Sequence, residues 1–420
     1  MNESHKKSFF RYLLIFSLLF SSMAMFTVLM LQGENSNRLD RSIVYNLKTN
    51  FELNHFNQKP NLYIFEQVII NSQSTINQEQ NRFIPYQETV MLSNWVKGNY
   101  SSVAVRKDRF QNKLLVITAN LSSGETVSAS SEYEITITEV DFESAKPIEI
   151  IGEDTRDEIY ALYSNQKDTY YQGSNQELIN LSYNIVGNET DSIKIARKIV
   201  TWISTNIKYS KYSYKFYIDM SWGALETFQT REGVCWDFSE LMVTLLRIQH
   251  IPARTVIGFV LDKNEPKEGD IFEFYYNWKN KSYESNPLSL HAWVEYFVPE
   301  YGWLASDPTW SDAGLTYFNE LDVIHFRFGA GAWFSMPISP FWEGSYLSLY
   351  PISLIPRNSS EYNFTIKITV MESILEVSLP LPIIINDNLI FICLPYLIIN
   401  IFEFPMKKYL IKTIKLKELF

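Results

Sequence analysis

Short β-branched and aromatic runs alternate with polar turns in the first third of the chain. The runs are NLYIFEQVII, SSVAVRK, KLLVITA and EYEITITEV, between about residues 61 and 142, and polar turns such as LSSGET separate them. Runs of this length and composition predict strands, and several in succession predict a β-sandwich. The pattern therefore predicts a β-sandwich-like module over residues 33–150.

The periodicity becomes helical after Asp154. In ETDSIKIARKIVTWISTNI the apolar residues at helical spacing are Ile193, Ala196, Val200, Ile203 and Ile207. Strand-like runs return at residues 255–261, 271–276, 292–298 and 303–306. Helices followed by antiparallel strands predict an α+β domain over residues 151–345, with a β-strand extension at residues 346–382.

An apolar run near the start of the chain predicts a membrane anchor. Residues 12–32 form an uncharged run of 21 residues after Lys6, Lys7 and Arg11. A helix needs about 20 apolar residues to cross a bilayer, and basic residues favour the cytoplasmic side. We therefore expect residues 1–11 inside, a transmembrane helix at residues 12–32 and residues from about 33 to 380 outside. A cleaved signal peptide is the alternative, but its apolar region usually has only about 7 to 15 residues.

A second apolar run lies near the other end. Residues 383–404 are mostly apolar but contain Asp387 and Pro395, and the basic tail 405–420 follows. A basic tail is typical of a cytoplasmic end, which a second membrane crossing would produce. A buried hairpin that turns near residues 386–388 and an interfacial helix in the tail are the alternatives.

Composition and charge exclude some classes of function. The chain has 420 residues, 46% of them hydrophobic, and a formal net charge of -10. This length can bury a large core, and no nucleic-acid partner is expected, because phosphate binding needs clustered Lys and Arg. Cys235 and Cys393 are the two cysteines. Cys393 lies in the apolar run near the end, so no disulfide framework is expected.

Cys235 lies where an apolar helix is predicted to begin. Gly233 allows a tight turn before it, and the apolar stripe over residues 236–249 predicts a helix that a proline ends. The free N–H groups and the positive dipole at a helix N-terminus stabilise a thiolate. Asp237 and Glu240 lie in the same turn and oppose this effect, so the thiol would also need an imidazole. The alternative is that the cysteine is a small buried hydrophobe.

Distances along the predicted elements narrow the choice of histidine. His250 closes the same helix, about 22 Å from the thiol at 1.5 Å per residue, and cannot reach it. His5 precedes the membrane run and His55 lies in the β-rich module, which leaves His291 and His325.

His291 opens an alternating strand, HAWVEYFV, and a second strand, GWLASDPTW, follows the turn at residues 299–302. In an antiparallel hairpin, a register with Asp307 opposite His291 or Trp293 places the carboxylate on the face of the histidine. Such a carboxylate would fix the tautomer of the imidazole. It would then be the orienting group in a triad of nucleophile, base and orienting group. Taken singly, His291 is more simply a core or edge histidine and Asp307 the start of an Asp-Pro turn.

Three segments resemble a known family. REGVCWDFSELMVTLLRIQHIPARTVIGF, HAWVEYFVPEYGW and SDPTW occur in the order of the motifs of the transglutaminase-like superfamily. Those motifs are a G-x-C helix start, L-R-x-x-x-I-P-A-R, H-A-W-x-E and G-W-x-x-x-D-P-T. The resemblance covers roughly residues 192–310. It implies a papain-like α+β fold, in which the helix that begins at Cys235 packs against the antiparallel sheet that bears His291.

The resemblance also implies roles for single residues. Cys235 would be the nucleophile, His291 the general base and acid, and Asp307 the orienting residue of acyl transfer through a thioester. The N–H of Cys235 would be one oxyanion donor, and Trp222 or Gln229 is the candidate for the other. No metal and no cofactor are expected.

Three classes of function remain. We expect a membrane-anchored cysteine hydrolase or peptidase that acts on peptide or glutamine-type amides of a protein or peptide substrate, outside the cell membrane. A protein cross-linking transglutaminase would need a protected route for an amine acceptor, of which the sequence gives no sign. A non-enzymatic binding module is the third class, and the intact Cys, His and Asp set argues against it.

Overall fold

The computed structural model describes residues 39–70, 86–107, 112–141, 153–164, 171–210, 223–262, 265–277, 282–286, 288–310, 317–330, 352–355 and 361–377. Residues Asp40–Glu376 form one compact unit, and the elements below lie in it. The apolar segments expected at residues 12–32 and 383–404 lie outside the described residues. Within the described part, no helix is long and apolar enough to cross a membrane.

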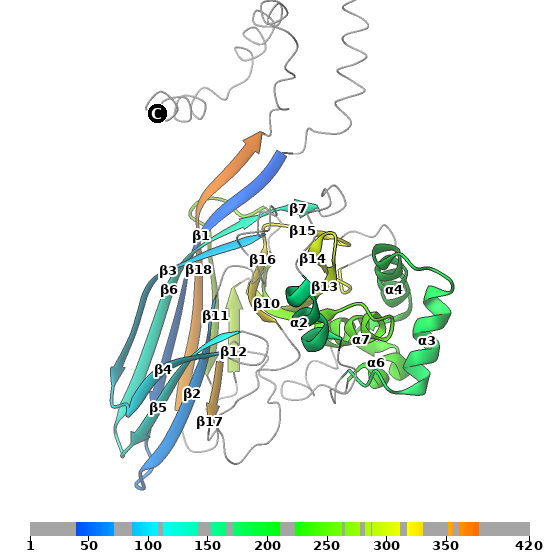
Figure 1. The fold of residues 1–420 in the computed structure, drawn as a ribbon. Helices are drawn as coiled ribbons and strands as arrows, with labels where there is room; N and C mark the ends of the chain where they lie inside the picture. The colour runs from blue at the N-terminus through cyan, green and yellow to red at the C-terminus, as the bar shows by residue number, and fades with distance from the viewer. Residues whose placement is uncertain are drawn as a thin grey trace, which may run out of the picture. The chain divides into compact units, whose positions relative to one another are not determined.

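Two antiparallel sheets form the β-rich part (Figure 1). The six-stranded sheet has the order β12 (Ser282–Asn286), β11 (Ile271–Asn277), β18 (Glu361–Val377), β1 (Leu39–Asn54), β6 (Thr126–Thr138) and β3 (Gln87–Gly98). The four-stranded sheet has the order β17 (Ile352–Ile355), β2 (Asn61–Ile69), β5 (Lys113–Leu121) and β4 (Ser102–Lys107).

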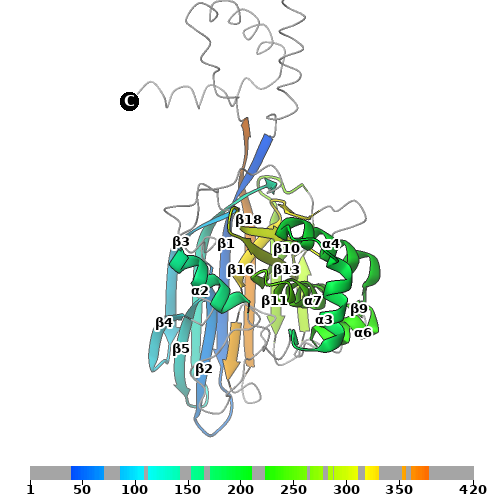
Figure 2. The same cartoon turned by 45° about the vertical axis from the view of Figure 1, so that its right-hand side comes forward.

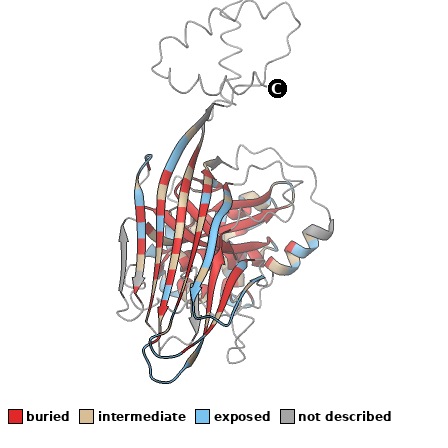
Figure 3. Cartoon of the chain, turned by 90° about the vertical axis from the view of Figure 1, so that its left-hand side faces the viewer, coloured by how far each residue is buried: buried red, intermediate tan, exposed pale blue. Residues whose placement is uncertain are grey.

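The two sheets pack face to face. Buried and more exposed residues alternate along β6, and Figure 3 shows such changes of colour along several strands of these sheets. Phe51 of β1 stacks on Phe65 of β2 with 3.6 Å between ring centroids. The Gln67 amide of β2 donates to the Thr49 hydroxyl of β1 at 2.6 Å. Side chains of period two therefore build a core between the sheets, as in a sandwich.

A third antiparallel sheet carries the helices (Figures 1 and 2). Its order is β14 (Gly302–Ser306), β13 (Leu288–Val298), β10 (Ala253–Leu261) and β16 (His325–Ala330). The helices are α2 (Glu153–Tyr163), α3 (Gln176–Val186), α4 (Ser192–Asn206), α6 (Ala224–Thr230) and α7 (Cys235–Ile248). Helix α7 packs against β13 and β10 and against α3, α4 and α6. It is thus a central helix, buried along nearly its whole length.

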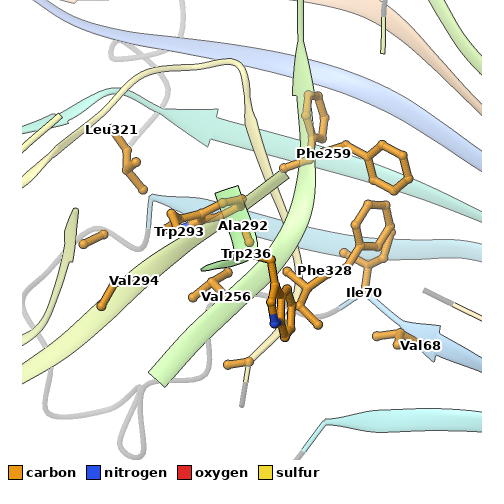
Figure 4. Packing of buried hydrophobic residues seen from close by; sticks show 14 of the residues in the cluster. Val68, Ile70, Trp236, Val256, Phe259, Ala292, Trp293, Val294, Leu321 and Phe328 are labelled. Atoms are coloured by element: carbon orange, nitrogen blue, oxygen red, sulfur yellow. The ribbon is translucent and has the colours of Figure 1, made fainter. Parts of the chain in front are cut away.

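Short strand pairs close the connections. β7 (Val140–Asp141) pairs with β15 (Glu320–Leu321), and β8 (Lys208–Tyr209) pairs in parallel with β9 (Glu232–Gly233). The second pair ties the chain after α4 to the residues just before α7. Figure 4 shows Trp236, at the start of α7, in the same buried cluster as Val256 of β10 and Ala292 of β13.

The strand expected at residues 271–276 forms, but in another sheet. The sequence pattern placed it with the strands of the α+β domain, whereas β11 pairs with β12 and β18 in the six-stranded sheet. An alternating pattern shows which side chains are buried, and it does not show which strand supplies the backbone partner. The β-rich part is therefore completed by strands from far along the chain.

A buried ion cluster joins the β-rich part to the third sheet. The Glu295 carboxylate of β13 accepts from Arg254 of β10 at 2.6 Å and from Arg327 of β16 at 3.1 Å. It also accepts from the hydroxyl of Tyr86, at 2.9 Å. Burial raises the pKa of Glu295, but the two guanidinium groups outweigh it and lower the pKa to about 2. The Gln87 amide adds hydrogen bonds to both backbone groups of Arg327, and so fixes the position of β16.

Candidate active site

The start of α7 presents Cys235 at a helix N-terminus. Val234, the N-cap residue, has an extended backbone and a side chain that cannot accept a hydrogen bond. Asp237 takes over part of the capping role, because its Oδ2 accepts the Val234 N–H at 2.9 Å. The Cys235 side chain is partly exposed, while its neighbour Trp236 is buried. The packing of α7 therefore leaves the thiol at the end of the helix, within reach of a substrate.

Gly233 is required by this cap. A Cβ atom at position 233 would lie 2.6 Å from the Cβ of Asp237, closer than Cβ atoms approach. The G-x-C pattern therefore has a local physical cause: the glycine makes room for the carboxylate that caps the helix.

Asp237 brings a titratable group next to the thiol. Burial raises the pKa of Asp237 to about 6, and the hydrogen bond from Val234 opposes the rise. The carboxylate is therefore charged at neutral pH. Its negative charge disfavours a thiolate nearby and so opposes the effect of the helix dipole on Cys235, as the sequence indicated.

The hairpin of β13 and β14 sets the position of Asp307. The pairs run from Val298 with Gly302 to Val294 with Ser306, so the next pair in this register is Trp293 with Asp307. This is one of the two registers that the sequence allowed. The hairpin predicted from the alternating pattern is therefore confirmed, and Asp307 follows directly after β14.

The structure brings Cys235, His291 and Asp307 together. Nε2 of His291 lies 2.5 Å from Oδ2 of Asp307, and Cys235 lies near enough to the imidazole to raise its pKa. Because Nε2 faces the carboxylate, Nδ1 is the ring nitrogen that remains for the thiol. Trp310 stacks on the imidazole, with ring centroids 4.9 Å apart and planes inclined by 28°. The ring is therefore held from three sides.

Asp307 is held as a carboxylate. It is fully buried, its Oδ1 accepts the Thr309 N–H at 2.8 Å, and its own N–H donates to the Tyr317 carbonyl at 2.9 Å. Burial raises the pKa of Asp307, but the charge and hydrogen bond of His291 and the contact with His325 outweigh it and lower the pKa.

His291 is correspondingly held as an imidazolium. Burial lowers the pKa of His291, but the charges and hydrogen bonds of Asp307 and Cys235 outweigh it and raise the pKa to about 10. A histidine with these partners can accept the thiol proton and keep it next to the sulfur. The three side chains thus have the order of nucleophile, base and orienting group.

His325, the other histidine that the sequence left open, lies behind Asp307. Its Nε2 is 3.5 Å from Oδ2 of Asp307, and its Nδ1 is 2.7 Å from Oδ1 of Asp322. The Tyr317 hydroxyl donates to the other oxygen of Asp322 at 2.8 Å. No motif or spacing in the sequence connects Asp322 or Tyr317 to Asp307, so neither residue was predicted to lie at the site.

The two candidates for a second oxyanion donor have different outcomes. Trp222 lies outside the described residues. Gln229 is exposed on α6, and its amide nitrogen donates to both carboxylate oxygens of Glu177, at 3.2 and 3.3 Å. Its amide thus points to α3 in this structure, and its role as an oxyanion donor stays a prediction.

One group of side chains has the composition of a metal site. His291, Asp307 and His325 each offer one ligand atom, and these atoms lie within 4.8 Å of one another. However, the 2.5 Å contact between His291 and Asp307 is a hydrogen bond, with a proton where a shared metal ion would have to lie. The geometry is that of a hydrogen-bonded chain, so no metal is assigned to it.

Comparison with known proteins places a family match over these residues. Residues 179–308, which include Cys235, His291 and Asp307, match the family model of the Transglutaminase-like superfamily. The "Uncharacterized protein YebA" of Bacillus subtilis (strain 168) is 40% identical over 96 residues, which are 23% of this chain and 12% of that protein. A "Protein-glutamine gamma-glutamyltransferase" of Pseudomonas aeruginosa is 35% identical over 86 residues, 20% of this chain and 11% of that protein. The matched segment therefore spans only about an eighth of each curated relative.

A solved structure resembles more of the chain. It is described as "a Putative Cysteine Protease from Cytophaga hutchinsonii" and has a TM-score of 0.47 and 16% sequence identity. The similar region covers 83% of this chain and 97% of that one.

Proposed function

From the transglutaminase-like domain at residues 179–308, we propose that this protein is a cysteine enzyme that hydrolyses amide bonds of peptides or glutamine side chains. The observation that carries the proposal is that His291 forms a hydrogen bond with Asp307 and lies beside Cys235. The thiol is partly exposed, while the other two side chains are buried. A substrate can therefore reach the sulfur without exposing the groups that activate it.

The proposed reaction has two steps through a thioester. The Cys235 sulfur attacks the amide carbonyl carbon, and the C–N bond breaks while His291 gives its Nδ1 proton to the leaving amine or ammonia. Water then attacks the thioester and gives a proton to His291. The C–S bond breaks, the acid is released and the thiolate and imidazolium are restored. Asp307 keeps its Nε2 hydrogen bond throughout and holds the ring in one orientation.

Helix geometry supports stabilisation of the oxyanion. The N–H of Cys235 lies in the first turn of α7, where backbone N–H groups have no partner within the helix. It is therefore a donor for the negative oxygen of the tetrahedral intermediate.

A second candidate is transfer of the acyl group to an amine, which would cross-link proteins. The observation that favours it is the sequence similarity to the Pseudomonas aeruginosa protein-glutamine gamma-glutamyltransferase. The first step is the same in both candidates, and only the acceptor of the thioester differs. Water is the acceptor that we propose, because Cys235 is only partly buried, so that solvent can approach the residue that would carry the thioester.

One assay separates these functions. The full chain is incubated with a glutamine-containing peptide library, with and without a labelled primary amine, and the products are analysed by mass spectrometry. Hydrolysis with no amine incorporation supports the proposal, and amine incorporation supports the cross-linking transglutaminase. Cys235→Ala must abolish either product, whereas Asp262→Asn, which changes an exposed carboxylate bound to Ser289, should retain full activity. Absence of turnover in the wild type would instead favour a binding module.

We also propose that the protein is anchored in the cell membrane with its catalytic domain outside. The support is the uncharged run at residues 12–32 and the basic residues before it. Protease added to sealed vesicles of native orientation should digest the catalytic domain. Protection of that domain from the protease would show the opposite orientation.

A further inference from the structure

The side chain of His325 lies between two carboxylates. Its Nδ1 is 2.7 Å from Oδ1 of Asp322, and its Nε2 is 3.5 Å from Oδ2 of Asp307. The ring is completely buried, so both nitrogens face acceptors within the protein. A neutral imidazole has one N–H and would turn a lone pair toward one of these oxygens. Only the imidazolium donates to both.

Both carboxylates have other donors that keep them ionised. Oδ1 of Asp322 also accepts the Ile324 N–H at 3.1 Å, and its Oδ2 accepts the Tyr317 hydroxyl at 2.8 Å. Oδ1 of Asp307 accepts the N–H groups of Thr309 at 2.8 Å and Trp310 at 3.3 Å, and its Oδ2 is shared by the two histidines. The charges therefore alternate along the chain of His291, Asp307, His325 and Asp322.

Aromatic rings surround the His325 imidazole. Trp293 and Trp310 present T-shaped contacts, with ring centroids 5.3 and 5.1 Å away, and Tyr317 lies at 5.6 Å. Trp310 also stacks on His291, so one indole packs against both imidazoles. These rings help to shield the imidazole from water, in agreement with its complete burial.

The fold has a specific feature that lets His325 reach this position. His325 begins β16, which pairs with β10 through a register shift between Ile257 and Gly258. A Cβ atom at Gly258 would lie 1.8 Å from the Phe326 carbonyl oxygen. A glycine at this position is therefore needed for β16 to approach β10 and place the imidazole behind Asp307.

We propose that His325 is a positioning residue of the active site: a buried, permanently protonated imidazole that holds Asp307 in place and shares its negative charge. This inference rests on the proposed function, because it assigns the catalytic pair to His291 and Asp307. His325 would limit how strongly the charge of Asp307 stabilises the protonated form of His291. The result is a base that still releases its proton to the leaving amine.

The charged surroundings agree with this assignment. Burial lowers the pKa of His325, but the hydrogen bonds and charges of Asp307 and Asp322 outweigh it and raise the pKa. Among the described residues, the titratable groups that face the ring are these two carboxylates, His291 and the Tyr317 hydroxyl. Arg327, the next cation on β16, is paired with Glu295.

The size of the expected effect follows from the distance between the two imidazoles. Their ring centroids are 5.7 Å apart. Removing one of two like charges at this separation should raise the pKa of the other group by about one to two units, at the effective dielectric of a protein interior. Replacing His325 by a neutral residue should therefore make His291 harder to deprotonate.

The test compares two alkylating reagents on the full chain. Iodoacetate is an anion that the His291 imidazolium attracts, whereas iodoacetamide is neutral. The rate of alkylation of Cys235 by iodoacetate is divided by the rate with iodoacetamide, with both measured by mass spectrometry of the Cys235 peptide over a range of pH. This rate ratio should fall at the pH where His291 loses its proton. In His325→Gln, the pH at which the rate ratio falls should be higher by about one unit or more. His325→Lys keeps a cation between the carboxylates, so the rate ratio of this variant should fall near the same pH as in the wild type.

His55→Gln removes another fully buried histidine, whose ring bonds Tyr63 and the Lys59 carbonyl in the β-rich part, and should leave the ratio unchanged. If the rate ratio of His325→Gln falls at the same pH as that of the wild type, the inference is overturned. Equal shifts of this pH in the Gln and Lys variants would also overturn it, because they would indicate an effect of packing alone. A wild type that is alkylated with this pH dependence but turns over no amide would contradict the proposed function and leave the inference supported. A folded wild type whose thiol neither reagent reaches would overturn both.

Discussion

His291 and Asp307 are 16 residues apart in the sequence, and their side chains share a hydrogen bond of 2.5 Å. The hairpin register, with Val294 opposite Ser306, brings the carboxylate to the face of β13 that carries the imidazole. A shift of one residue would turn Asp307 to the opposite face. The contact between these two side chains therefore depends on one turn, at residues 299–302, and on the register that it sets.

Asp307→Asn should reduce turnover but leave the thiol reactive. The amide can no longer stabilise the imidazolium and disturbs its tautomer, which in a Ser-His-Asp protease costs about 10⁴-fold in kcat. We expect a loss of about 10²- to 10⁴-fold in amide hydrolysis, with the iodoacetamide rate at Cys235 changed far less. Asp262→Asn is the matched control. Equal losses of turnover and thiol reactivity would show that Asp307 supports the fold and not the reaction.

His291→Ala should slow alkylation of Cys235. His291 lies beside Cys235, and an imidazolium beside a cysteine generally favours the thiolate, which is the reactive form. The wild-type protein should react with iodoacetamide faster than a model thiol at pH 7, and the variant should lose that advantage. His55→Ala, in the β-rich part, should react like the wild type. A wild-type cysteine labelled only after denaturation would support the interpretation as a buried hydrophobe.

The proton on His291 should make the stability depend on alkaline pH. Its pKa is raised from 6.5 to about 10, so the folded state binds this proton more tightly than the unfolded state. This contribution is fully present below pH 6.5, declines as the pH rises and is lost above about 10. In urea unfolding, the wild type should lose more stability between pH 6.5 and 10 than His291→Gln. Parallel curves for the two proteins would show that the histidine is not held as an imidazolium.

Glu295→Gln should destabilise the protein strongly. The substitution leaves Arg254 and Arg327 buried without their counter-charge, a change that typically costs about 3–5 kcal/mol. Tyr86→Phe removes one hydrogen bond to the same carboxylate and should cost about 1–3 kcal/mol. Denaturant unfolding gives both free energies. Similar stabilities of Glu295→Gln and the wild type would contradict a structural role of this cluster.

Gly233→Ala should damage the cap before Cys235. The new Cβ would lie 2.6 Å from the Cβ of Asp237, and such overpacking typically costs about 1–3 kcal/mol. We also expect slower alkylation, because the first turn of α7 has to move. Asp237→Gly removes the opposing atom, so Gly233→Ala should cost clearly less in that background. A double-mutant cycle with no coupling between the two positions would exclude this contact as the cause.

The sequence alone determined the local elements of the site. The apolar stripe predicted a helix at residues 236–249, and α7 spans Cys235–Ile248. The alternating runs predicted the hairpin that carries His291 and Asp307, which forms as β13 and β14. Helix period and strand alternation depend on neighbours a few residues away, and a four-residue turn limits the register. The nearby sequence is therefore enough to predict these features.

The tertiary structure decided which distant segments meet. Nothing in the sequence pattern assigned β11 to the sheet of β18, or indicated that Tyr86 would bind Glu295. The sequence narrowed the base to two histidines, and the fold then placed His325 behind Asp307, with Asp322 on its far side. These contacts follow from the order of strands in each sheet and from the close approach that Gly258 permits. Sheet order is set by long-range packing of the whole core, which the period of a single strand does not encode.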